Sequence, residues 1–535
     1  MRHKIAQLLN TANSLRQATG ILVITALASN VLGLVRNTVV ARNIPLAAQD
    51  DFWTAFVIPD TVFNVLIFGA IGAAFIPLFR GLLVTAKQDD AWELAGSFLA
   101  RMSLMIVSLA VLLFIFMPAV VHLIFAKVTG ADSALVINLS RILLVQTILM
   151  GWSYIVGGIL NAKKRFLAYS LSPLFYNMAI IVGAFLAPRF GGDQAITVLI
   201  WSVVVGALLH LLIQIPSLLA VGWRFKYLNF RPNEYFREII SLMTPRSIAL
   251  GITSINAVVF TAIARNLLAP GSLSIYRLVE AFQTAPIAIF ANAIAVAFFP
   301  TLTEHASKEN WTEFGASLER GLRFTLFTLI PSTVIFIVLR AQIIRLYIGL
   351  GPSISWEETI TAIQAFGWFS IGIVPAGLVS IFARGFYAVK NTILPMLIAI
   401  FTLIFGALTA YTLSLATTFG ASALTIASSA ASLVQFIALY IAYIRLVRRP
   451  LPEKAIIITG LKTVAVSLAM GLAMWLTLQG VHILYTETAI TSTRFVTGLF
   501  GQTLLATIIG LTVFWLFARR WLKEESGWLL TFRRK

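Results

Sequence analysis

The sequence predicts an all-α polytopic membrane protein with about 14 transmembrane helices, and three observations lead to this fold class. Of the 535 residues, 59% are hydrophobic and only 11% are charged, whereas about a quarter of a soluble globular chain is charged. The mean hydropathy is +0.90, and the apolar residues gather in stretches of about 20 residues, the length that crosses a bilayer. The basic residues concentrate in every second loop, as they do in multi-pass membrane proteins.

Fourteen apolar stretches follow one another along the chain, and each is long enough to form a spanning helix. The first stretch is too long for the apolar part of a secretory signal peptide and lacks a small-residue cleavage pattern, so we expect it to remain as the first span. The stretches begin near Gly20, Thr61, Ser97, Ser133, Leu167, Ala195, Ile239, Tyr276, Gly321, Thr359, Thr392, Ala421, Ala455 and Phe495.

The Lys and Arg residues predict which side of the membrane each loop faces. Alternate loops hold 29 of them and the intervening loops hold seven. Because cytoplasmic loops carry an excess of Lys and Arg, we expect the richer set, and with it both termini, in the cytoplasm. The net charge of +19 therefore indicates topology and contact with anionic lipids, not a nucleic-acid surface. The richer set comprises the N-terminus, 79–96, 161–166, 222–246, 303–323, 384–390, 445–462 and the C-terminus.

Two parts of the chain, 223 residues apart, are similar in sequence. The letters ARN at 41–43 recur at 264–266, and Pro77 and Pro300 each follow the arginine by 35 residues without a gap. The segments that end at these prolines are also similar, AIGAAFIP against AIAVAFFP. Two matches in one register indicate an internal duplication.

A weaker similarity, at a shift of 227, joins GILNAKKRF from Gly158 to GFYAVKNTI from Gly385. Because the copies begin an even number of spans apart, the repeat predicts two six-helix lobes of the same orientation, as in known transporters. We expect an N-terminal lobe over 1–225, a C-terminal lobe over 226–450, and two extra transmembrane helices with a basic cytoplasmic tail over 451–535. Two such lobes can rock around a site between them, which favours a carrier with alternating access over a pore or a scaffold.

Arg36 lies well inside the first apolar stretch. An ionisable group in a span costs about 2.5–3.5 kcal/mol on insertion scales and is by default a functional candidate. A guanidinium that faces a wet cleft can hold a diphosphate through paired hydrogen bonds. The alternative is that Arg36 reaches the outer headgroups or pairs with Asp50 or Asp51. Arg101 and Arg141 lie nearer to span ends, where we expect anchors.

Other polar residues in the spans have both functional and structural interpretations. Arg277 and Glu280 lie three residues apart on one helical face, so they either neutralise each other or leave the arginine partly available to an anion. Asp60 follows Pro59 and is either a ligand or the cap of the second spanning helix. His210 stands alone in an apolar helix and is expected to be a buried histidine with satisfied hydrogen bonds.

The chain lacks the sequence patterns of common catalytic and metal sites. It contains no cysteine and no Gly-rich loop followed by Lys and Ser or Thr, and its five histidines show no metal-ligand spacing. The outer loops are too short for a catalytic domain, which disfavours a polyprenyl-linked glycosyltransferase. We therefore expect a transporter and not an enzyme, with no cofactor and no metal.

Five stretches resemble a known family in its own order along the chain. They are SNVLGLVRNTVVARN to GAIGAAFIPLF within 29–79, ILNAKKRFLAYSLSPLFYN at 159–177, APGSLS at 269–274, AIAVAFFPTLTEHA at 293–306 and FARGFYAVKNTILP at 382–395. These stretches resemble the MurJ (MviN) lipid II flippases of the multidrug/oligosaccharidyl-lipid/polysaccharide exporter superfamily, which have 14 spans in two lobes.

The resemblance implies a flippase for lipid II, an undecaprenyl-diphosphate-linked saccharide-peptide of cell-wall peptidoglycan biosynthesis, on which cell shape depends. It also implies location in the bacterial cytoplasmic (inner) membrane, contact with membrane lipids and no nucleic-acid partner. Cell-wall synthesis proteins are further expected partners.

In this family, arginines of the central cavity take the diphosphate of the cargo. Carried over residue by residue, the resemblance marks Arg36 and Arg42 as substrate-binding. The family's earlier arginine in the same helix corresponds to Asn30, and its arginine after the Ile-Pro of the second span falls near residues 63–64.

In the eighth span the family's arginine aligns with Ala281, whereas Arg277 lies one turn earlier on the same face and Glu280 corresponds to the family's acid. The positive charge of the cavity is therefore redistributed, or the cargo differs from lipid II. The candidate substrate-binding residues are Arg36, Arg277, Glu280, Asn30, Arg42 and Asp60.

Three alternatives to lipid II transport remain open at this point. They are a flippase for another polyprenyl-diphosphate-linked oligosaccharide, a drug or small-solute antiporter on the same fold, and a non-transporting scaffold for envelope synthesis. An antiporter for cationic drugs should present acids in its cleft instead of arginines. A scaffold should tolerate the loss of Arg36 and Arg277.

Overall fold

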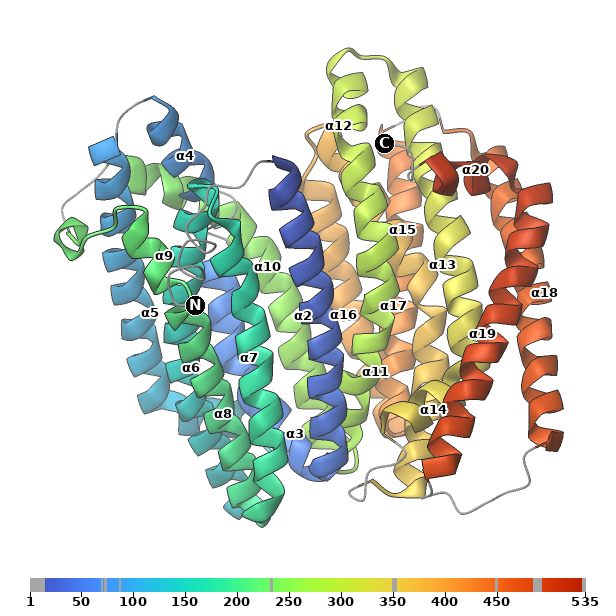
Figure 1. Cartoon of the computed structure of the whole chain (residues 1–535), viewed down its shortest axis with the longest axis horizontal. Coiled ribbons are helices and arrows are strands. Elements are labelled where there is room, and N and C mark those ends of the chain that lie inside the picture. The colour runs from blue at the N-terminus through green and yellow to red at the C-terminus, as the bar shows by residue number, and fades with distance from the viewer. Residues whose placement is uncertain are drawn as a thin grey trace. The chain divides into compact units, whose positions relative to one another are not determined.

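The protein is described by a computed structural model over residues 15–68, 71, 75–85, 88–230, 234–348, 354–447, 451–484 and 493–531. Within these ranges every regular element is a helix and no strand occurs, so the predicted all-α class is confirmed. By its contacts the chain divides into two compact units, Met1–Asn266 (unit 1) and Leu267–Lys535 (unit 2) (Figure 1).

Each unit is built from helices that follow one another along the chain. Unit 1 contains α2 (Leu15–Asn43), α3 (Leu46–Phe63), η1 (Asn64–Phe68), α4 (Ile76–Val84), α5 (Gln88–Ile124), α6 (Gly130–Ala162), α7 (Phe166–Leu186), η3 (Ala187–Arg189), α8 (Gly192–Leu212), α9 (Ile215–Ala220), η4 (Phe225–Tyr227) and α10 (Glu234–Leu267). Unit 2 contains α11 (Ser272–Pro286), η5 (Ile287–Asn292), α12 (Ala293–Ser307), α13 (Trp311–Tyr347), α14 (Trp356–Ile371), α15 (Ile373–Ala388), α16 (Ile393–Ala416), α17 (Ala421–Ala442), η6 (Tyr443–Val447), α18 (Glu453–Leu484), α19 (Thr493–Trp521) and α20 (Lys523–Thr531).

Among the described residues, 13 helical segments are long and apolar enough to cross a membrane. They cover every apolar stretch that the sequence predicts except the one that begins near Thr61. There the geometry changes, because α3 ends at Phe63 and a π-helix, η1, follows over Asn64–Phe68. A π segment interrupts the regular ladder of backbone hydrogen bonds and is frequent at functional positions. Within this stretch the α-helix α3 therefore changes into a π-helical segment.

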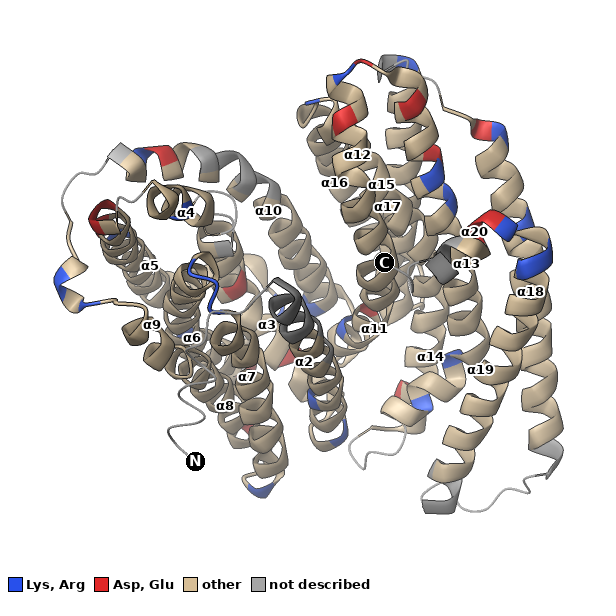
Figure 2. Ribbon diagram, turned by 45° about the horizontal axis from the view of Figure 1, so that its top comes forward, with Lys and Arg blue, Asp and Glu red and all other residues tan. Residues whose placement is uncertain are grey.

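The surface of the long helices suits contact with lipid. Figure 2 shows charged residues mostly near helix ends and in loops. Apolar side chains cover the outside of the helices between them, and on α5 the residues Val111, Leu112, Phe114, Ile115 and Phe116 are each at least 50% exposed. A soluble protein rarely exposes such a contiguous apolar surface, whereas a lipid-facing helix requires one.

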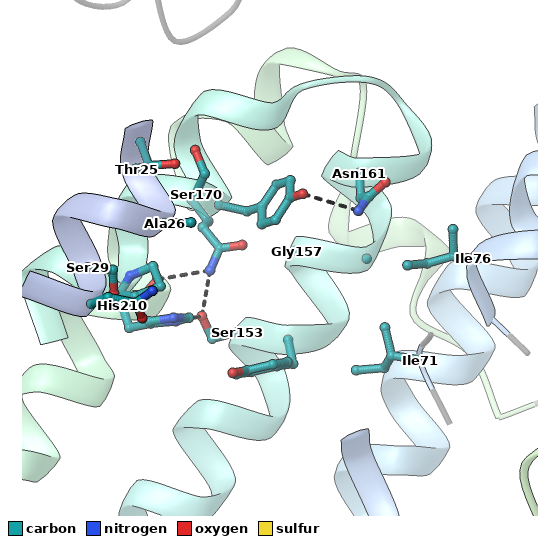
Figure 3. Close-up of a pocket in the computed structure, with 16 residues that line it drawn as sticks. Thr25, Ala26, Ser29, Ile71, Ile76, Ser153, Gly157, Asn161, Ser170 and His210 are labelled. Atoms are coloured by element: carbon teal, nitrogen blue, oxygen red, sulfur yellow. Dashed lines mark hydrogen bonds between the residues drawn. The ribbon is translucent and has the colours of Figure 1, made fainter. Parts of the chain in front are cut away.

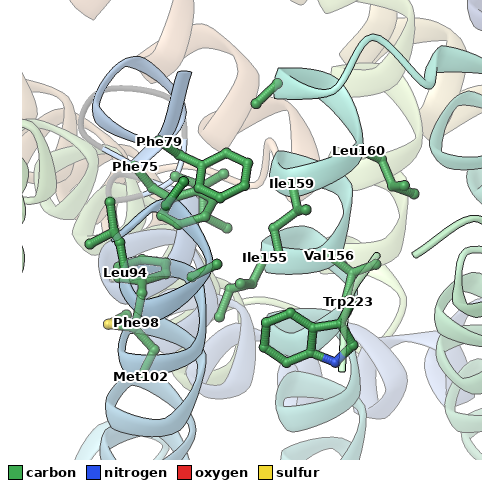
Figure 4. Close-up of a cluster of buried hydrophobic side chains, with 14 of the residues drawn as sticks. Phe75, Phe79, Leu94, Phe98, Met102, Ile155, Val156, Ile159, Leu160 and Trp223 are labelled. Carbon is green, nitrogen blue, oxygen red and sulfur yellow. The ribbon is translucent and has the colours of Figure 1, made fainter. Parts of the chain in front are cut away.

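The main core of unit 1 lies where α4, α5 and α6 meet (Figure 4). The ring of Phe75 stacks on Phe98 with 4.7 Å between centroids, and Phe79 stacks on Phe75 at 5.4 Å. Gly158 of α6 faces these rings, and a Cβ there would lie 3.0 Å from Ile71 and 3.3 Å from Phe75. The missing side chain lets α6 approach the aromatic cluster and positions the cavity-facing side of α6.

Helix geometry repeats where the sequence repeats. The first ARN ends α2 at Asn43, and the second lies in the last turn of α10, which ends at Leu267. The π-helical segment η1 starts at Asn64 and η5 starts at Ile287, again 223 residues later. The two ARN segments, each at a helix end, and the starts of the two π segments share one register, which supports the internal duplication.

The second similarity also has a structural counterpart, in the way α6 and α15 end. Lys164 and Lys390 have left-handed backbone, with φ of 59° and 60°. The next residues, Arg165 and Asn391, donate their N–H groups to the carbonyl five residues earlier, as in a Schellman helix end. Residues with the same backbone conformation in these two helix ends are 226 apart. The sequence similarity uses a shift of 227, so the sequence alignment and the structural alignment differ by one residue.

Contacts near its C-terminal end attach α10 to unit 1. Arg265 places Nη2 2.6 Å from Asp51 Oδ1 and Nη1 3.7 Å from Asp50 Oδ2. Asn266 donates from Nδ2 to the carbonyl oxygen of Ile124 at 2.9 Å. The contacts thus divide the chain after Asn266, whereas the lobe boundaries at 225 and 450 follow the sequence repeat and stay a prediction.

Candidate substrate-binding site

Arg36 lies in the second half of α2 and links this helix to α7. Its Nη1 donates to Oδ1 of Asn177 at 3.0 Å. Its Nε and Nη2 donate to Oδ1 of the neighbouring Asn37 at 2.9 and 2.8 Å. All three bonds go to neutral amide oxygens, so they orient the planar guanidinium and leave its charge in place.

The alternative in which Arg36 pairs with Asp50 or Asp51 is wrong, because both carboxylates contact Arg265. Within the described ranges, no Asp or Glu forms a salt bridge with Arg36. The side chain is also partly buried, and a charge in a region of lower dielectric attracts an opposite charge more strongly than it does in water. Arg36 is therefore suited to bind an anion.

Asp60 lies near the C-terminal end of α3, which begins at Leu46. Its interpretation as an N-terminal helix cap is wrong, because the helix starts four turns earlier than the apolar stretch suggests. The charges of Asp60 and Arg36 both act on the hydroxyl of Tyr176 in α7. The two candidate residues, from α2 and α3, thus lie in the same part of unit 1.

Unit 1 contains a cavity of about 440 Å³, lined mainly by residues of α2, α6, α7 and α8, with Ile71, and with Ile76 of α4, on the remaining side (Figure 3). The candidate residue Asn30 lines this cavity. In Figure 3, Ser29 and His210 lie on one side of the space, and Ile71 and Ile76 lie on the opposite side. Its volume falls in the range of small-molecule pockets, about 300–1,000 Å³.

Beside His210 the cavity wall consists of polar side chains that are hydrogen-bonded to one another. His210 Nδ1 and Ser153 Oγ are 2.6 Å apart, and the imidazole stacks on Tyr154 with ring planes 7° apart. Gln214 donates from Nε2 to Ser153 Oγ at 2.6 Å and to the carbonyl oxygen of His210 at 2.9 Å. His210 is 6% exposed, so the prediction of a buried, satisfied histidine is confirmed.

A lysine lies close in sequence to the cavity wall, at the end of α6. Asn161 lines the cavity, and Lys163 caps the helix two residues later. The Nζ of Lys163 lies 4.9 Å from the ring centroid of Trp92, and burial lowers the pKa of Lys163. This cation–π contact holds the ammonium group of Lys163 against α5, the helix that contains Trp92.

The other candidates lie apart from the cavity wall or belong to unit 2. Arg42 lies in the last turn of α2 and is not among the residues that line the cavity. In unit 2, Arg277 Nη1 lies 3.0 Å from Glu280 Oε2, with side chains 18% and 34% exposed. The predicted ion pair is therefore present, and the carboxylate offsets much of the arginine's charge.

Three residues of the candidate site, Asn177, Ser153 and Gln214, are not singled out by the sequence patterns. Each is a polar side chain in or directly after an apolar stretch, and Gln214 follows His210 by four residues, which places both on one helical face. Polar residues in spans are common when they are satisfied by neighbours. Only the packing shows which of them face a cavity.

Comparison with known proteins agrees with this architecture. The sequence profile of the family described as "Lipid II flippase MurJ" matches residues 46–506. The lipid II flippase MurJ of Burkholderia cenocepacia is 27% identical over 398 residues, which are 72% of this chain and 75% of that protein. The "Probable lipid II flippase MurJ" of Treponema pallidum is 24% identical over 444 residues, 81% of this chain and 82% of that one.

Solved structures share the fold. A lipid II flippase MurJ in an inward closed conformation matches with a TM-score of 0.73 and 22% identity, over 93% of this chain and 99% of that one. An inward-facing multidrug resistance MATE family transporter of the MOP superfamily matches with a TM-score of 0.66 and 13% identity, over 77% and 93%. The family profile covers most of the chain, so this protein belongs to the MurJ family of lipid II flippases, which are transporters and not enzymes.

Proposed function

We propose that this protein moves lipid II, the undecaprenyl-diphosphate-linked precursor of peptidoglycan, from the inner to the outer leaflet by alternating access. The observation that carries the proposal is the match of the MurJ family profile to residues 46–506. The 13 apolar helical segments and the family together make this a multi-pass protein of the inner membrane.

In this proposal Arg36 binds the diphosphate of the cargo. Its guanidinium is oriented by Asn37 and Asn177, and its charge is not offset by a salt bridge within the described ranges. Asp60 acts on the same tyrosine and moderates the positive potential, because a carrier must bind its cargo weakly enough to release it. Arg42, Arg277 and Glu280 are proposed contacts at other stages of the crossing.

The distribution of basic residues supports an orientation with both termini in the cytoplasm, since 29 Lys and Arg lie in the corresponding loops and seven in the others. The cavity of unit 1 is built from the end of α6, the start of α7 and the region around Gln214, which adjoin the loops 161–166 and 222–246. In this orientation the cavity lies toward the cytoplasmic side, where the cargo is made. Proteins of cell-wall synthesis are proposed as further partners.

A second candidate is a flippase for another polyprenyl-diphosphate-linked oligosaccharide. The neutral side chain of Asn30 on the cavity wall favours it, because the resemblance places a family arginine at this position. A cavity with fewer cations can select a cargo with a different head group.

Expression in a bacterium depleted of its own lipid II flippase tests the proposal. Growth restored by the wild-type chain would support lipid II as cargo. Translocation of labelled lipid II in vesicles with the purified protein provides a test that does not depend on the host. Absence of translocation in vesicles that contain folded protein would contradict the proposal and favour the other oligosaccharide.

A further inference from the structure

Gln214 presents an oxygen without a hydrogen-bond partner at the cavity of unit 1. The residue is 1% exposed and lines the cavity. Its Nε2 makes two hydrogen bonds, whereas its Oε1 has none in the part of the chain that the structure describes. A buried acceptor without a donor is costly, and because this one belongs to a residue of the cavity wall, a ligand in the cavity can supply the missing donor.

The orientation of this amide is fixed by its neighbours. The carbonyl oxygen of His210 lies 2.9 Å from Nε2, and a carbonyl can only accept a hydrogen bond. Rotating the amide by half a turn would bring two acceptors together at that distance. The nitrogen must therefore face His210 and Ser153, and the oxygen must face away from them.

Gly157 of α6 lies directly beside this oxygen. It also lines the cavity, and a Cβ built on it would lie 3.2 Å from Oε1 of Gln214. Any side chain at this position would cover the acceptor. A ligand atom can therefore approach this oxygen from the side of α6 only if residue 157 is a glycine.

We propose that the cavity is a carbohydrate subsite for the cargo, in which Gln214 Oε1 accepts a hydrogen bond from a sugar hydroxyl or an acetamido N–H. The inference rests on the proposed function. A sugar presents hydroxyl groups at its edge and C–H groups on its face, and the cavity offers matching surfaces. Asn30 and Gln214 are polar, whereas Ile71, Pro173 and Tyr154 provide apolar contact.

The subsite adjoins the proposed diphosphate contact through Tyr176. This ring meets His210 edge-on, with 6.5 Å between centroids and planes at 89°, and the next residue of α7, Asn177, accepts a hydrogen bond from Arg36 at 3.0 Å. On α2, Asn30 and Arg36 are six residues apart, about 9 Å along the helix axis. One cargo molecule can thus place its sugar at Gln214 and its diphosphate at Arg36.

Binding of two lipids to the purified full chain separates sugar recognition from diphosphate recognition. The probes are lipid II and undecaprenyl diphosphate, which lacks the sugars and peptide. Gln214→Met should weaken lipid II binding about threefold to tenfold, the effect of one hydrogen bond, and leave the affinity for undecaprenyl diphosphate unchanged. Gly157→Ala, which covers the oxygen but keeps the bonds to Ser153 and His210, should cause the same selective loss.

Gln146→Met is the matched control for this experiment. Gln146 also lies in unit 1, is 4% exposed and has an Oε1 without a hydrogen-bond partner among the described residues, but it does not line the cavity. Its variant should leave both affinities unchanged. Equal weakening of both lipids by Gln214→Met and Gly157→Ala, or no change in either, would overturn the subsite. Wild-type protein that binds neither lipid would overturn the proposed function, and the subsite with it.

Discussion

Arg36 differs from the other arginines of the unit 1 spans in its partners. Arg141 donates to the backbone carbonyl of Phe114 and lies over its ring at 4.7 Å. Arg101 donates to a backbone carbonyl and lies 4.6 Å from the ring centroid of Phe236. Backbone and ring contacts are those of an anchor, whereas the side-chain amides around Arg36 can rearrange when an anion enters.

Arg36→Gln should abolish growth of the flippase-depleted strain while the protein still inserts into the membrane. A hydrogen bond to a charged group contributes about 1.5–3 kcal/mol, and the variant loses the charge as well as the paired donors. Arg36→Lys should restore growth only in part, because an ammonium cannot form the two-pronged contact. Arg141→Gln serves as the control and should support growth. Full growth with Arg36→Gln would remove this arginine from the mechanism.

Arg265 offsets the negative charge of two carboxylates, Asp50 and Asp51, and its loss should destabilise unit 1. Asp50 and Asp51 are 3% and 14% exposed at the side chain, and removal of one partner from a buried pair costs about 3–5 kcal/mol. Arg265→Gln should therefore lower the Tm of the purified protein clearly. Lys308→Gln, which breaks an exposed pair with Glu304, should change it little. Similar Tm values for the two variants would show that the contacts of Arg265 stabilise the protein no more than an exposed ion pair does.

At the scale of elements, the loop after α9 packs closely on α5. Trp92 of α5 meets Trp223 and Tyr227, with ring centroids 6.0 and 5.7 Å apart. Gly96, one turn further along α5, has no room for a side chain, since its Cβ would collide with the backbone carbonyl oxygen of Tyr227. The glycine lets the loop lie directly on the helix.

Gly96→Ala should destabilise the protein by about 1–3 kcal/mol, the usual cost of extra volume in a packed core. Backbone atoms on the opposing loop cannot move aside as a flexible side chain can. Thermal unfolding of the detergent-solubilised protein measures the effect. Gly81→Ala is the control, because a Cβ there meets nothing within 4 Å. An unchanged Tm for Gly96→Ala would show that the loop shifts at no cost.

At the scale of the whole molecule, the absence of cysteine allows a direct test of orientation. Asp193 in the first turn of α8 and Lys226 in η4 are both exposed and lie in loops of opposite predicted side. Asp193→Cys should react with a membrane-impermeant maleimide in intact spheroplasts. Lys226→Cys should react only after permeabilisation. The reverse pattern would place both termini outside the cytoplasm.

The sequence by itself determined the helical class, the positions of nearly all spans and the internal duplication. These features depend on local composition, because about 20 apolar residues suffice to cross a bilayer whatever surrounds them. Arg36 was also visible in the sequence, since a charge inside an apolar stretch is expensive and therefore rare. The change to π-helical geometry at Asn64–Phe68 was not visible, because no proline or glycine marks these five residues.

Only the tertiary structure decided which polar groups meet. Asn177 bonds Arg36 from 141 residues away, and Arg265 reaches Asp51 across 214 residues. Ser153 and Gln214 meet beside His210 and form one wall of the cavity. Such contacts depend on which face each helix turns toward its neighbours, and hydropathy does not specify a face when a helix is apolar all round.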